Sequence, residues 1–162
     1  MTTTPTGRLL DGRLELTRRF KASIDDVWAS ITEPERTARW FGHWSGEGRP
    51  GATVRLTLDH GDEQTESDLT IIACEPPRRL EVDVIDEEGR WRLEARLAED
   101  GGVTTLTFVH HLDPETDVTS VGPGWEYTLA LLTALVTDAP EPNFDDYYPA
   151  MAEYYKGLTT AD

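Results

Sequence analysis

The stretch VTTLTFVHHLDPETDVTSVGPGWEYTLALLTAL, residues 103–135, decides the fold class of this chain. Its opening residues carry a period-two pattern, typical of a strand that buries one face, and that face holds Leu106, Phe108, His110 and Leu112. After Gly122-Pro123-Gly124, apolar residues recur every three or four positions, as in an amphipathic helix whose stripe contains Trp125, Leu129 and Leu132. We therefore expect a long helix that covers the apolar face of the strand.

The residues upstream predict more strands of the same sheet. A first strand is expected in GRLELTRRF, residues 12–20, and further period-two segments occupy residues 52–59, 67–75, 79–86 and 90–97. Consecutive strands joined by short turns predict an antiparallel meander with one apolar and one solvated face. The solvated face carries acidic and basic residues, which we expect to pair across strands.

Two short helices are expected to interrupt the sheet near its start. Ser23 precedes Asp26 by three residues, which is a helix-start signature, and Pro34 opens a second helical turn. The Gly- and Pro-rich residues 44–51 predict a loop. The predicted fold class is thus α+β: a curved antiparallel sheet wrapped round a long C-terminal helix, with two short helices after strand 1.

The two ends of the chain lead to separate predictions. Residues 1–12 are expected to be flexible, and residues 13–158 to form a single domain. Aromatic residues recur at three- and four-residue steps from Phe144 to Tyr155 and predict a last helix that starts near Asp145 or Asp146. This helix is expected to pack on its own domain, and the alternative is a homodimer through the same face.

The charge of the chain excludes several classes of partner. Fifteen Lys and Arg against 31 Asp and Glu give a formal net charge of −16, so phosphate backbones and anionic lipid headgroups are repelled. We expect no nucleic-acid and no membrane partner. Cys74 is the single cysteine, which excludes an intrachain disulfide, and no apolar run reaches the roughly 20 residues of a membrane span. A cytoplasmic location is expected.

Three segments, in order, resemble one known family. They are PERTARWFGHWSGEGRPGATVRL (residues 34–56), IIACEPPRRLEVDV (residues 71–84) and residues 105–135 of the opening stretch. They resemble the Trp-then-Arg-Pro-Gly segment, the strand-Glu-Pro-Pro-turn-strand and the strand-loop-Gly-Trp-helix of proteins homologous to the activator of heat-shock protein 90 ATPase, in the START-like or SRPBCC superfamily. In one departure, Gly51-Ala52 stands where that family often has paired glycines. The resemblance implies the helix-grip (START-like) fold, with a cavity between sheet and helix.

The residues expected to contact a ligand lie at the cavity entrance and on its walls. The candidates are Trp40, His43, Trp44, Trp91, Phe108, His110, Trp125 and Leu129. The aromatic cluster at residues 40–44 either stacks on a flat ligand or caps the edge of the core. His110 is predicted to point inward, where a polar group needs a partner. It is either a ligand hydrogen-bond donor or general base, or a core histidine satisfied by backbone or water.

Three hypotheses for function follow. The leading one is non-catalytic binding of a small, mainly apolar or aromatic molecule in the cavity. The second is an enzyme of cyclase or hydrolase type that uses His110 as acid or base in the same cavity. The third is a protein-interaction module like the chaperone-ATPase activator, although that role belongs to a larger protein with an additional domain. Because the sequence contains no metal-ligand spacing and no Gly-rich phosphate loop, we expect no metal and no cofactor.

Overall fold

The computed structural model describes residues 5–59, 64–86, 89–113 and 116–160. The strands are β1 (Arg8–Leu10), β2 (Arg13–Phe20), β3 (His43–Ser45), β4 (Thr53–Asp59), β5 (Gln64–Glu75), β6 (Arg79–Asp86), β7 (Gly89–Asp100) and β8 (Val103–His111). The helices are α1 (Ile24–Thr32), α2 (Pro34–Thr37), α3 (Val118–Thr137), the 3-10 turn η1 (Phe144–Asp146) and α4 (Ala152–Thr160). The predicted α+β class, with two short helices after the first long strand, is confirmed.

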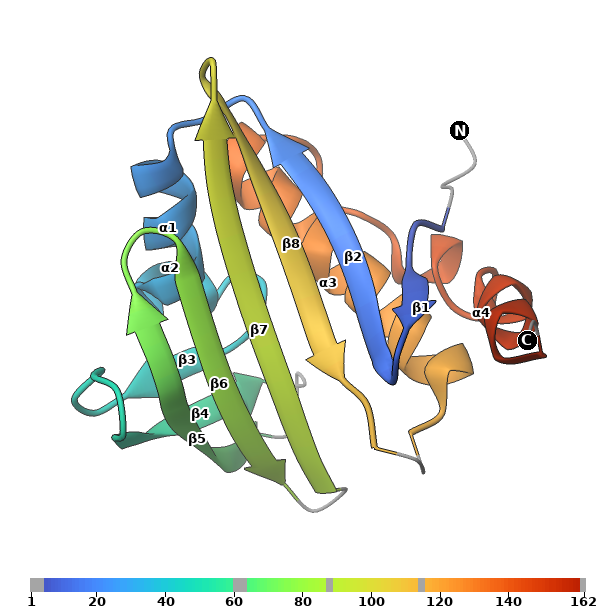
Figure 1. Cartoon of the computed structure of the whole chain (residues 1–162), viewed down its shortest axis with the longest axis horizontal. Coiled ribbons are helices and arrows are strands. Elements are labelled where there is room, and N and C mark those ends of the chain that lie inside the picture. Colours follow the sequence, from blue (N-terminus) through green and yellow to red (C-terminus); the bar gives the residue numbers. More distant parts are fainter. Residues whose placement is uncertain (1–4, 60–63, 87–88, 114–115, 161–162) are drawn as a thin grey trace.

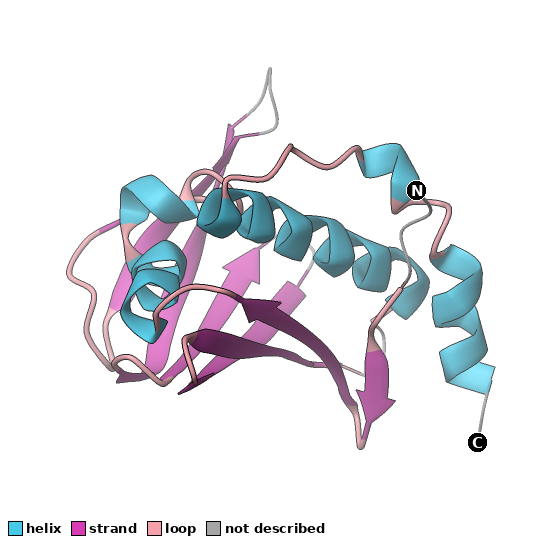
Figure 2. Ribbon diagram, turned by 90° about the horizontal axis from the view of Figure 1, so that it is seen from above, coloured by secondary structure: helices cyan, strands magenta, loops and turns pink. Residues whose placement is uncertain are grey.

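The strands form one curved antiparallel sheet with the order β1-β2-β8-β7-β6-β5-β4-β3. Figure 1 shows the long central strands side by side, and Figure 2 shows the sheet curving round α3, which lies along its concave face. The helices α1 and α2 lie together at one end of this groove, while α4 lies beside β1 at the other (Figure 1). This arrangement is the helix-grip fold that the sequence predicted.

The strand register confirms which side chains face the helix. His110 on β8 stands opposite Leu14 on β2 and opposite Leu93 on β7. Both leucines are buried, and His110 itself is only 1% exposed. Since residues directly opposite each other in a sheet share a face, His110 points to the concave side, as its alternation with Leu106 and Phe108 predicted.

The long helix starts earlier than expected. It begins at Val118, because the Asp117 side chain accepts a hydrogen bond from the Thr119 main-chain N–H and caps the first turn. Pro123 therefore lies inside the helix, where its fixed φ is compatible with helical backbone although one N–H donor is lost. Gly122 leaves room for the ring of Tyr155, because a Cβ built at this position would clash with that ring.

The stretch expected to be a loop after α2 starts with an ordered strand. Residues 43–45 pair with β4 as the short edge strand β3, and Trp44 stands opposite Leu56. Alternation along β3 leaves His43 and Ser45 exposed while Trp44 is partly buried against the core. The glycines and prolines of the segment come after this strand rather than through it.

Part of the segment expected to be flexible, residues 1–12, packs on the rest of the domain, and its flexibility stays a prediction. Residues 8–10 pair with β2 as strand β1, and Thr6 and Gly7 donate hydrogen bonds to the carboxylate of Glu126 on α3. The last helix differs from the prediction, since it starts at Ala152 rather than near residue 145. Pro149 disfavours helical backbone at the residue before it, so the segment is split into η1 and α4. Residues 1–4 lie outside the described residues.

The C-terminal segment packs on its own domain, which was the first of its two predicted destinations. Tyr147, Met151 and Tyr155 are buried in the main core. Phe144, Tyr148 and Tyr154 stay exposed on the same segment. A homodimer through these aromatic side chains stays a prediction.

A buried carboxylate on α3 ties these peripheral segments together. Glu126 is 1% exposed and accepts hydrogen bonds from the Tyr155 hydroxyl at 2.6 Å, from Arg18 Nη2 at 2.7 Å and from the Thr6 hydroxyl at 2.7 Å. Burial alone would raise the pKa of this carboxyl, but the hydrogen bonds from Tyr155, Thr6 and Arg18 outweigh burial and hold the pKa below its ordinary value. Four separate segments thus meet at one charged group.

Replacing Glu126 by Ala is expected to lower the free energy of unfolding by about 3–5 kcal/mol, because Arg18 and the buried Tyr155 hydroxyl then lose their acceptor. The measurement is urea denaturation at pH 7. Glu153→Ala, at an exposed position on α4, is the matched control and should change stability by less than about 0.5 kcal/mol. Equal effects of the two substitutions would show that the carboxylate does not hold these segments.

Candidate functional site

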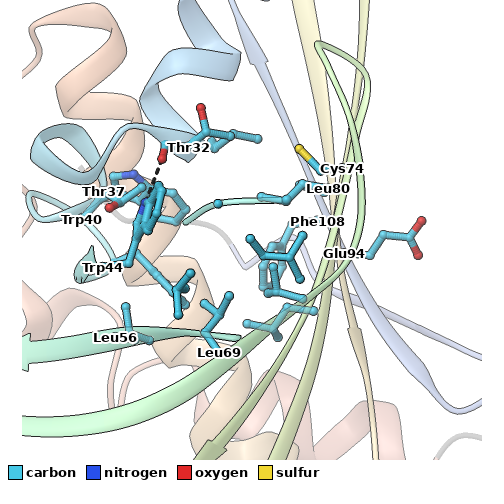
Figure 3. A pocket seen from close by; sticks show the side chains of 18 of the residues that line it. Thr32, Thr37, Trp40, Trp44, Leu56, Leu69, Cys74, Leu80, Glu94 and Phe108 are labelled. Carbon is cyan, nitrogen blue, oxygen red and sulfur yellow. Dashed lines mark hydrogen bonds between the residues drawn. The ribbon is translucent and has the colours of Figure 1, made fainter. Parts of the chain in front are cut away.

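An apolar cavity of about 140 Å³ lies between the sheet, the end of α1 and the segment that connects α2 to β3. Figure 3 shows its leucines converging from several strands toward the tryptophans on the opposite wall. The residues that line it include Leu56, Leu69, Leu80, Leu93, Phe108 and, from α3, Leu129. The cavity therefore occupies the part of the concave face that lies under β4 to β8.

The two tryptophans at the cavity wall have their polar atoms turned away from it. The indole N–H of Trp40 donates to the main-chain oxygen of Ser30, and that of Trp44 donates to the main-chain oxygen of Thr32, both at 2.8 Å. These two carbonyls belong to the last turn of α1, where carbonyl groups have no partner inside the helix. The indoles thus satisfy the helix end and present mainly carbon to the cavity (Figure 3).

The other polar groups at the wall are also occupied or point elsewhere. The hydroxyl of Thr32 donates to the Trp28 carbonyl at 2.7 Å, and the hydroxyl of Thr37 donates to the Pro34 carbonyl at 3.2 Å. Burial raises the pKa of the Cys74 thiol, so this group is neutral at pH 7. The carboxylate of Glu94 points away from the cavity to the outer side of the sheet (Figure 3).

The structure divides the predicted ligand-binding residues into groups. Trp40, Trp44, Phe108 and Leu129 line the apolar cavity. Trp91 and His110 line a second pocket instead, and Trp125 lies between the two groups, with its ring 4.6 Å from Phe108 and 6.2 Å from Trp91, centroid to centroid. His43 is exposed on β3 and does not line the cavity, because the neighbouring Trp44 takes the inward position of that strand. The cavity wall also contains Thr32, Thr37 and Cys74, which no pattern in the sequence places at a ligand site.

The second pocket has a volume of about 370 Å³ and lies near the start of α3. Its floor contains the rings of His110 and Trp91, which are stacked with centroids 5.3 Å apart. The indole N–H of Trp125 donates to Nδ1 of His110 at 3.1 Å. An indole nitrogen can only donate, so Nδ1 carries no proton and the neutral His110 ring is protonated at Nε2.

The environment of His110 favours this neutral form. Burial lowers the pKa of His110 to about 4, although the Asp113 carboxylate acts in the opposite direction, and His111 adds to the lowering. A protonated ring would also have no acceptor left for the Trp125 indole. The partner that the sequence analysis expected for His110 is therefore a side chain, Trp125, rather than backbone or water.

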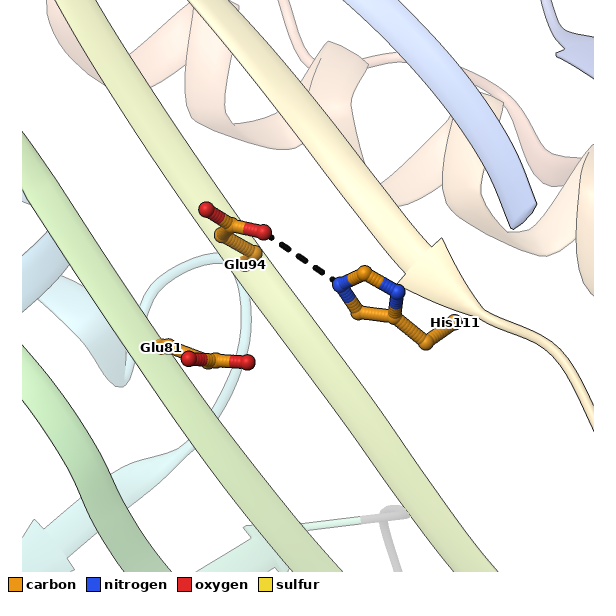
Figure 4. Close-up of side chains that lie close together, drawn as sticks. All are labelled: Glu81, Glu94 and His111. Atoms are coloured by element: carbon orange, nitrogen blue, oxygen red, sulfur yellow. Dashed lines mark hydrogen bonds and ion pairs between the residues drawn. The ribbon is translucent and has the colours of Figure 1, made fainter. Parts of the chain in front are cut away.

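A cluster of charged residues lies on the opposite face of the sheet. Oxygen and nitrogen atoms of Glu81, Glu94 and His111 lie within 4.8 Å of one another (Figure 4), which is close enough for a metal ion. However, Oε2 of Glu94 already accepts from Arg79 at 3.0 Å and from Arg96 at 2.8 Å. Burial acts to raise the pKa of Glu94, but these hydrogen bonds and one with His111 hold the pKa at about 2. The arrangement is a charge-compensated ion-pair network.

The pairing register of the strands brings the residues of this network together. Glu81 and Glu94 stand opposite each other on β6 and β7, and His111 stands opposite Arg92, two residues before Glu94 on the same face. The alternating charges of these strands predict pairing on this face, but the pattern does not place His111 in it.

The free energy of unfolding should fall as the pH is lowered from about 6.5 to 4, because the unfolded chain takes up a proton at His110 that the folded chain excludes. The difference between the pKa of His110 in the unfolded chain, about 6.5, and in the folded protein, about 4, corresponds to about 3 kcal/mol of unfolding free energy. Replacing His110 by Gln keeps an oxygen acceptor for Trp125 and removes the titration. We expect the wild-type protein to lose about 3 kcal/mol more than His110→Gln between pH 7 and 4, measured by urea denaturation. The same pH dependence in both proteins would contradict the neutral, buried state of His110.

Comparisons with known proteins agree with this architecture. The family model described as Activator of Hsp90 ATPase homolog 1-like protein matches residues 21–137. CalU16 from Micromonospora echinospora has 28% sequence identity and a TM-score of 0.76, over 98% of this chain and 97% of that chain. DynU16, from the dynemicin biosynthetic locus, has 26% identity and a TM-score of 0.69, over 83% of this chain and 51% of that chain.

A more distant structure, the protein encoded by gene BPP1335 of Bordetella parapertussis, shares the fold with a TM-score of 0.75 at 21% identity over 100% of this chain and 94% of that chain. A search of curated proteins gave no match. Within the described residues, no helix is long and apolar enough to cross a membrane.

Proposed function

The chain belongs to the family of Activator of Hsp90 ATPase homolog 1-like proteins, and we propose that it binds a small apolar molecule in the cavity beside Trp40 and Trp44. One observation carries this proposal: the hydroxyl and indole groups around the cavity already bond to main-chain carbonyls. A polar ligand would therefore lose hydrogen bonds to water and regain few of them here. An apolar ligand has no hydrogen bonds to water that it would lose on entry, and it gains contacts with the leucine side chains of the walls.

The size of the cavity limits the ligand. Drug-sized ligands occupy pockets of roughly 300–1,000 Å³, whereas an apolar cavity of roughly 150 Å³ stays dry and accepts a molecule such as benzene. The volume of about 140 Å³ thus fits one aromatic ring with few substituents. The indole rings of Trp40 and Trp44 supply flat apolar surfaces for such a ring.

The chemistry of the walls favours binding without turnover. Among the residues that line the cavity, Cys74 and Glu94 are the titratable ones. The thiol of Cys74 is held neutral, and the Glu94 carboxylate lies on the outer face of the sheet (Figure 3). His110, the general acid or base of the cyclase or hydrolase hypothesis, lines the second pocket instead.

The comparisons support a small molecule as the ligand class. DynU16, which matches 83% of this chain and is itself covered over 51% of its length, comes from a biosynthetic locus. No feature of the described residues specifically favours the chaperone-ATPase-activator hypothesis over binding in the cavity.

Toluene at ten times its dissociation constant is expected to raise the melting temperature by about 3–5 °C, because a ligand that binds the folded state alone stabilises it by about 1.4 kcal/mol at that concentration. Differential scanning fluorimetry in sealed cells measures the shift. Ala95→Leu places three more carbon atoms in the cavity and should abolish the shift. Ala98→Leu, on the exposed outer side of the same strand β7, should keep it.

If toluene raised the melting temperature of Ala95→Leu as much as that of the wild type, the ligand would bind elsewhere. If no compound in a panel of single-ring apolar molecules raised the melting temperature of the wild-type protein, the proposal would be wrong.

Cys74 offers a second readout, since it lines the cavity and is the single cysteine of the chain. We expect its reaction with iodoacetamide, followed by mass spectrometry at pH 8, to slow at least fivefold when toluene is saturating. An unchanged rate in the wild-type protein would show that the bound molecule does not cover this thiol.

A further inference from the structure

We propose that the second pocket, near the start of α3, is a separate binding site for a small neutral or cationic ring compound that carries hydroxyl or amine groups. This site differs from the apolar cavity in place and in chemistry. It is lined by Arg90 and Trp91 of β7, by His110 of β8 and Asp113 just after it, and by Ser120 and Val121 of α3.

A hydrogen-bond donor on the inner face of the sheet lines this pocket. Because Nδ1 of His110 accepts from Trp125, the proton of the ring is on Nε2, and the hydrogen bonds found among the described residues include none from that atom. His110 is only 1% exposed, yet it is one of the residues that line the pocket. Among the described residues no fully buried side-chain nitrogen or oxygen lacks a partner, so Nε2 of His110 is reached by solvent through the pocket that this residue lines. A ligand oxygen or aromatic nitrogen replaces that water as the acceptor.

The charges at the rim select against anions. Asp113 and Asp117 both line the pocket, and Asp117 already caps α3 through Thr119. The cationic group at the rim, Arg90, is paired with Asp83 on the outer face through two hydrogen bonds of 2.8 and 2.7 Å. A carboxylate or phosphate ligand would meet two acidic side chains and an arginine that is already neutralised. Ligands with N–H or O–H donors, or with a positive charge, are favoured instead.

The apolar part of such a ligand has matching surfaces. The indole of Trp91 is partly buried, and its ring stacks on His110 with an angle of 23° between the planes. Val121 adds a branched aliphatic group from the helix side. A planar ring can therefore lie against Trp91 while its polar substituent reaches His110.

An aromatic wall separates the two binding regions. Phe108 lines the apolar cavity, His110 lines the second pocket, and Trp125 contacts both rings, with centroid distances of 4.6 Å to Phe108 and 5.8 Å to His110. The indole signals in an NMR spectrum can thus report on both regions. Trp40 and Trp44 line the apolar cavity, Trp91 lines the second pocket, and Trp125 lies in the wall and is hydrogen-bonded to His110.

The experiment titrates ¹⁵N-labelled protein at pH 7.5 with three probes and follows the side-chain N–H signals of the five tryptophans. The probes are toluene, tyramine, and 3-(4-hydroxyphenyl)propionate, which replaces the amine of tyramine by a carboxylate. We expect toluene to shift the signals of Trp40 and Trp44. We expect tyramine to shift those of Trp91 and Trp125, with a dissociation constant of about 1 mM, and the anionic analogue to bind about tenfold more weakly.

Variants of adjacent residues test the role of the donor. His110→Leu removes the N–H and should weaken tyramine binding at least tenfold, whereas His110→Gln keeps an amide donor and should stay within about threefold of the wild type. His111→Gln, on the opposite face of β8, is the matched control and should have no effect. If His110→Leu does not fold, Val121→Trp blocks the pocket sterically, leaves His110 in place and should abolish tyramine binding.

The outcomes separate this proposal from the proposed function. Tyramine shifts limited to Trp40 and Trp44, or no shifts at 20 mM, would overturn the second site while leaving toluene binding intact. Equal binding of the anionic analogue, or full tyramine binding in Val121→Trp, would also overturn it. Tyramine shifts at Trp91 and Trp125 without any response to toluene would support the second site. This result would contradict only the proposed binding in the apolar cavity.

Discussion

Helix α3 packs off-centre against the concave face of the sheet, and this asymmetry creates the cavity. The helix contacts β2 and α1, and its residues Leu129 and Leu132 are almost fully buried there. Of the cavity walls, α3 supplies Leu129, while β4 to β8 and the segment from α2 to β3 supply most of the rest. The position of α3 is held near the middle of the helix by the Glu126 carboxylate, which accepts hydrogen bonds from Thr6, Arg18 and Tyr155.

The end of α1 decides the chemistry of that cavity. A helix end has carbonyl groups that need donors, and the donors here are the indoles of Trp40 and Trp44. Because the indole N–H groups donate to these carbonyls, neither ring presents a polar atom to the cavity. On the other side of the Phe108–Trp125 wall, the Trp125 indole fixes His110 as an Nε2 donor. Tryptophan indoles thus keep the cavity beside Trp40 and Trp44 apolar, and in the second pocket the indole of Trp125 orients the N–H donor of His110.

Local patterns in the sequence predicted the fold and part of the site. The alternation in β8 placed His110 inward, and the helical spacing placed Trp125 and Leu129 toward the sheet, because these periods follow from backbone geometry. The exposure of His43 would have required recognition of the three-residue strand β3. The ordering of Thr6 depends on Glu126, which is 120 residues away, so no local pattern could reveal it. The division into two pockets likewise arises from packing of side chains that are distant in sequence.

Crystallography under xenon pressure can show whether the space beside Trp40 and Trp44 is a dry, apolar binding cavity. Xenon enters apolar cavities that exclude water and gives strong electron density. We expect a xenon atom between the indole rings and the side chains of Leu93 and Ala95, without ordered water in the unpressurised crystal. Ordered water molecules in this space, with no xenon bound, would contradict this expectation.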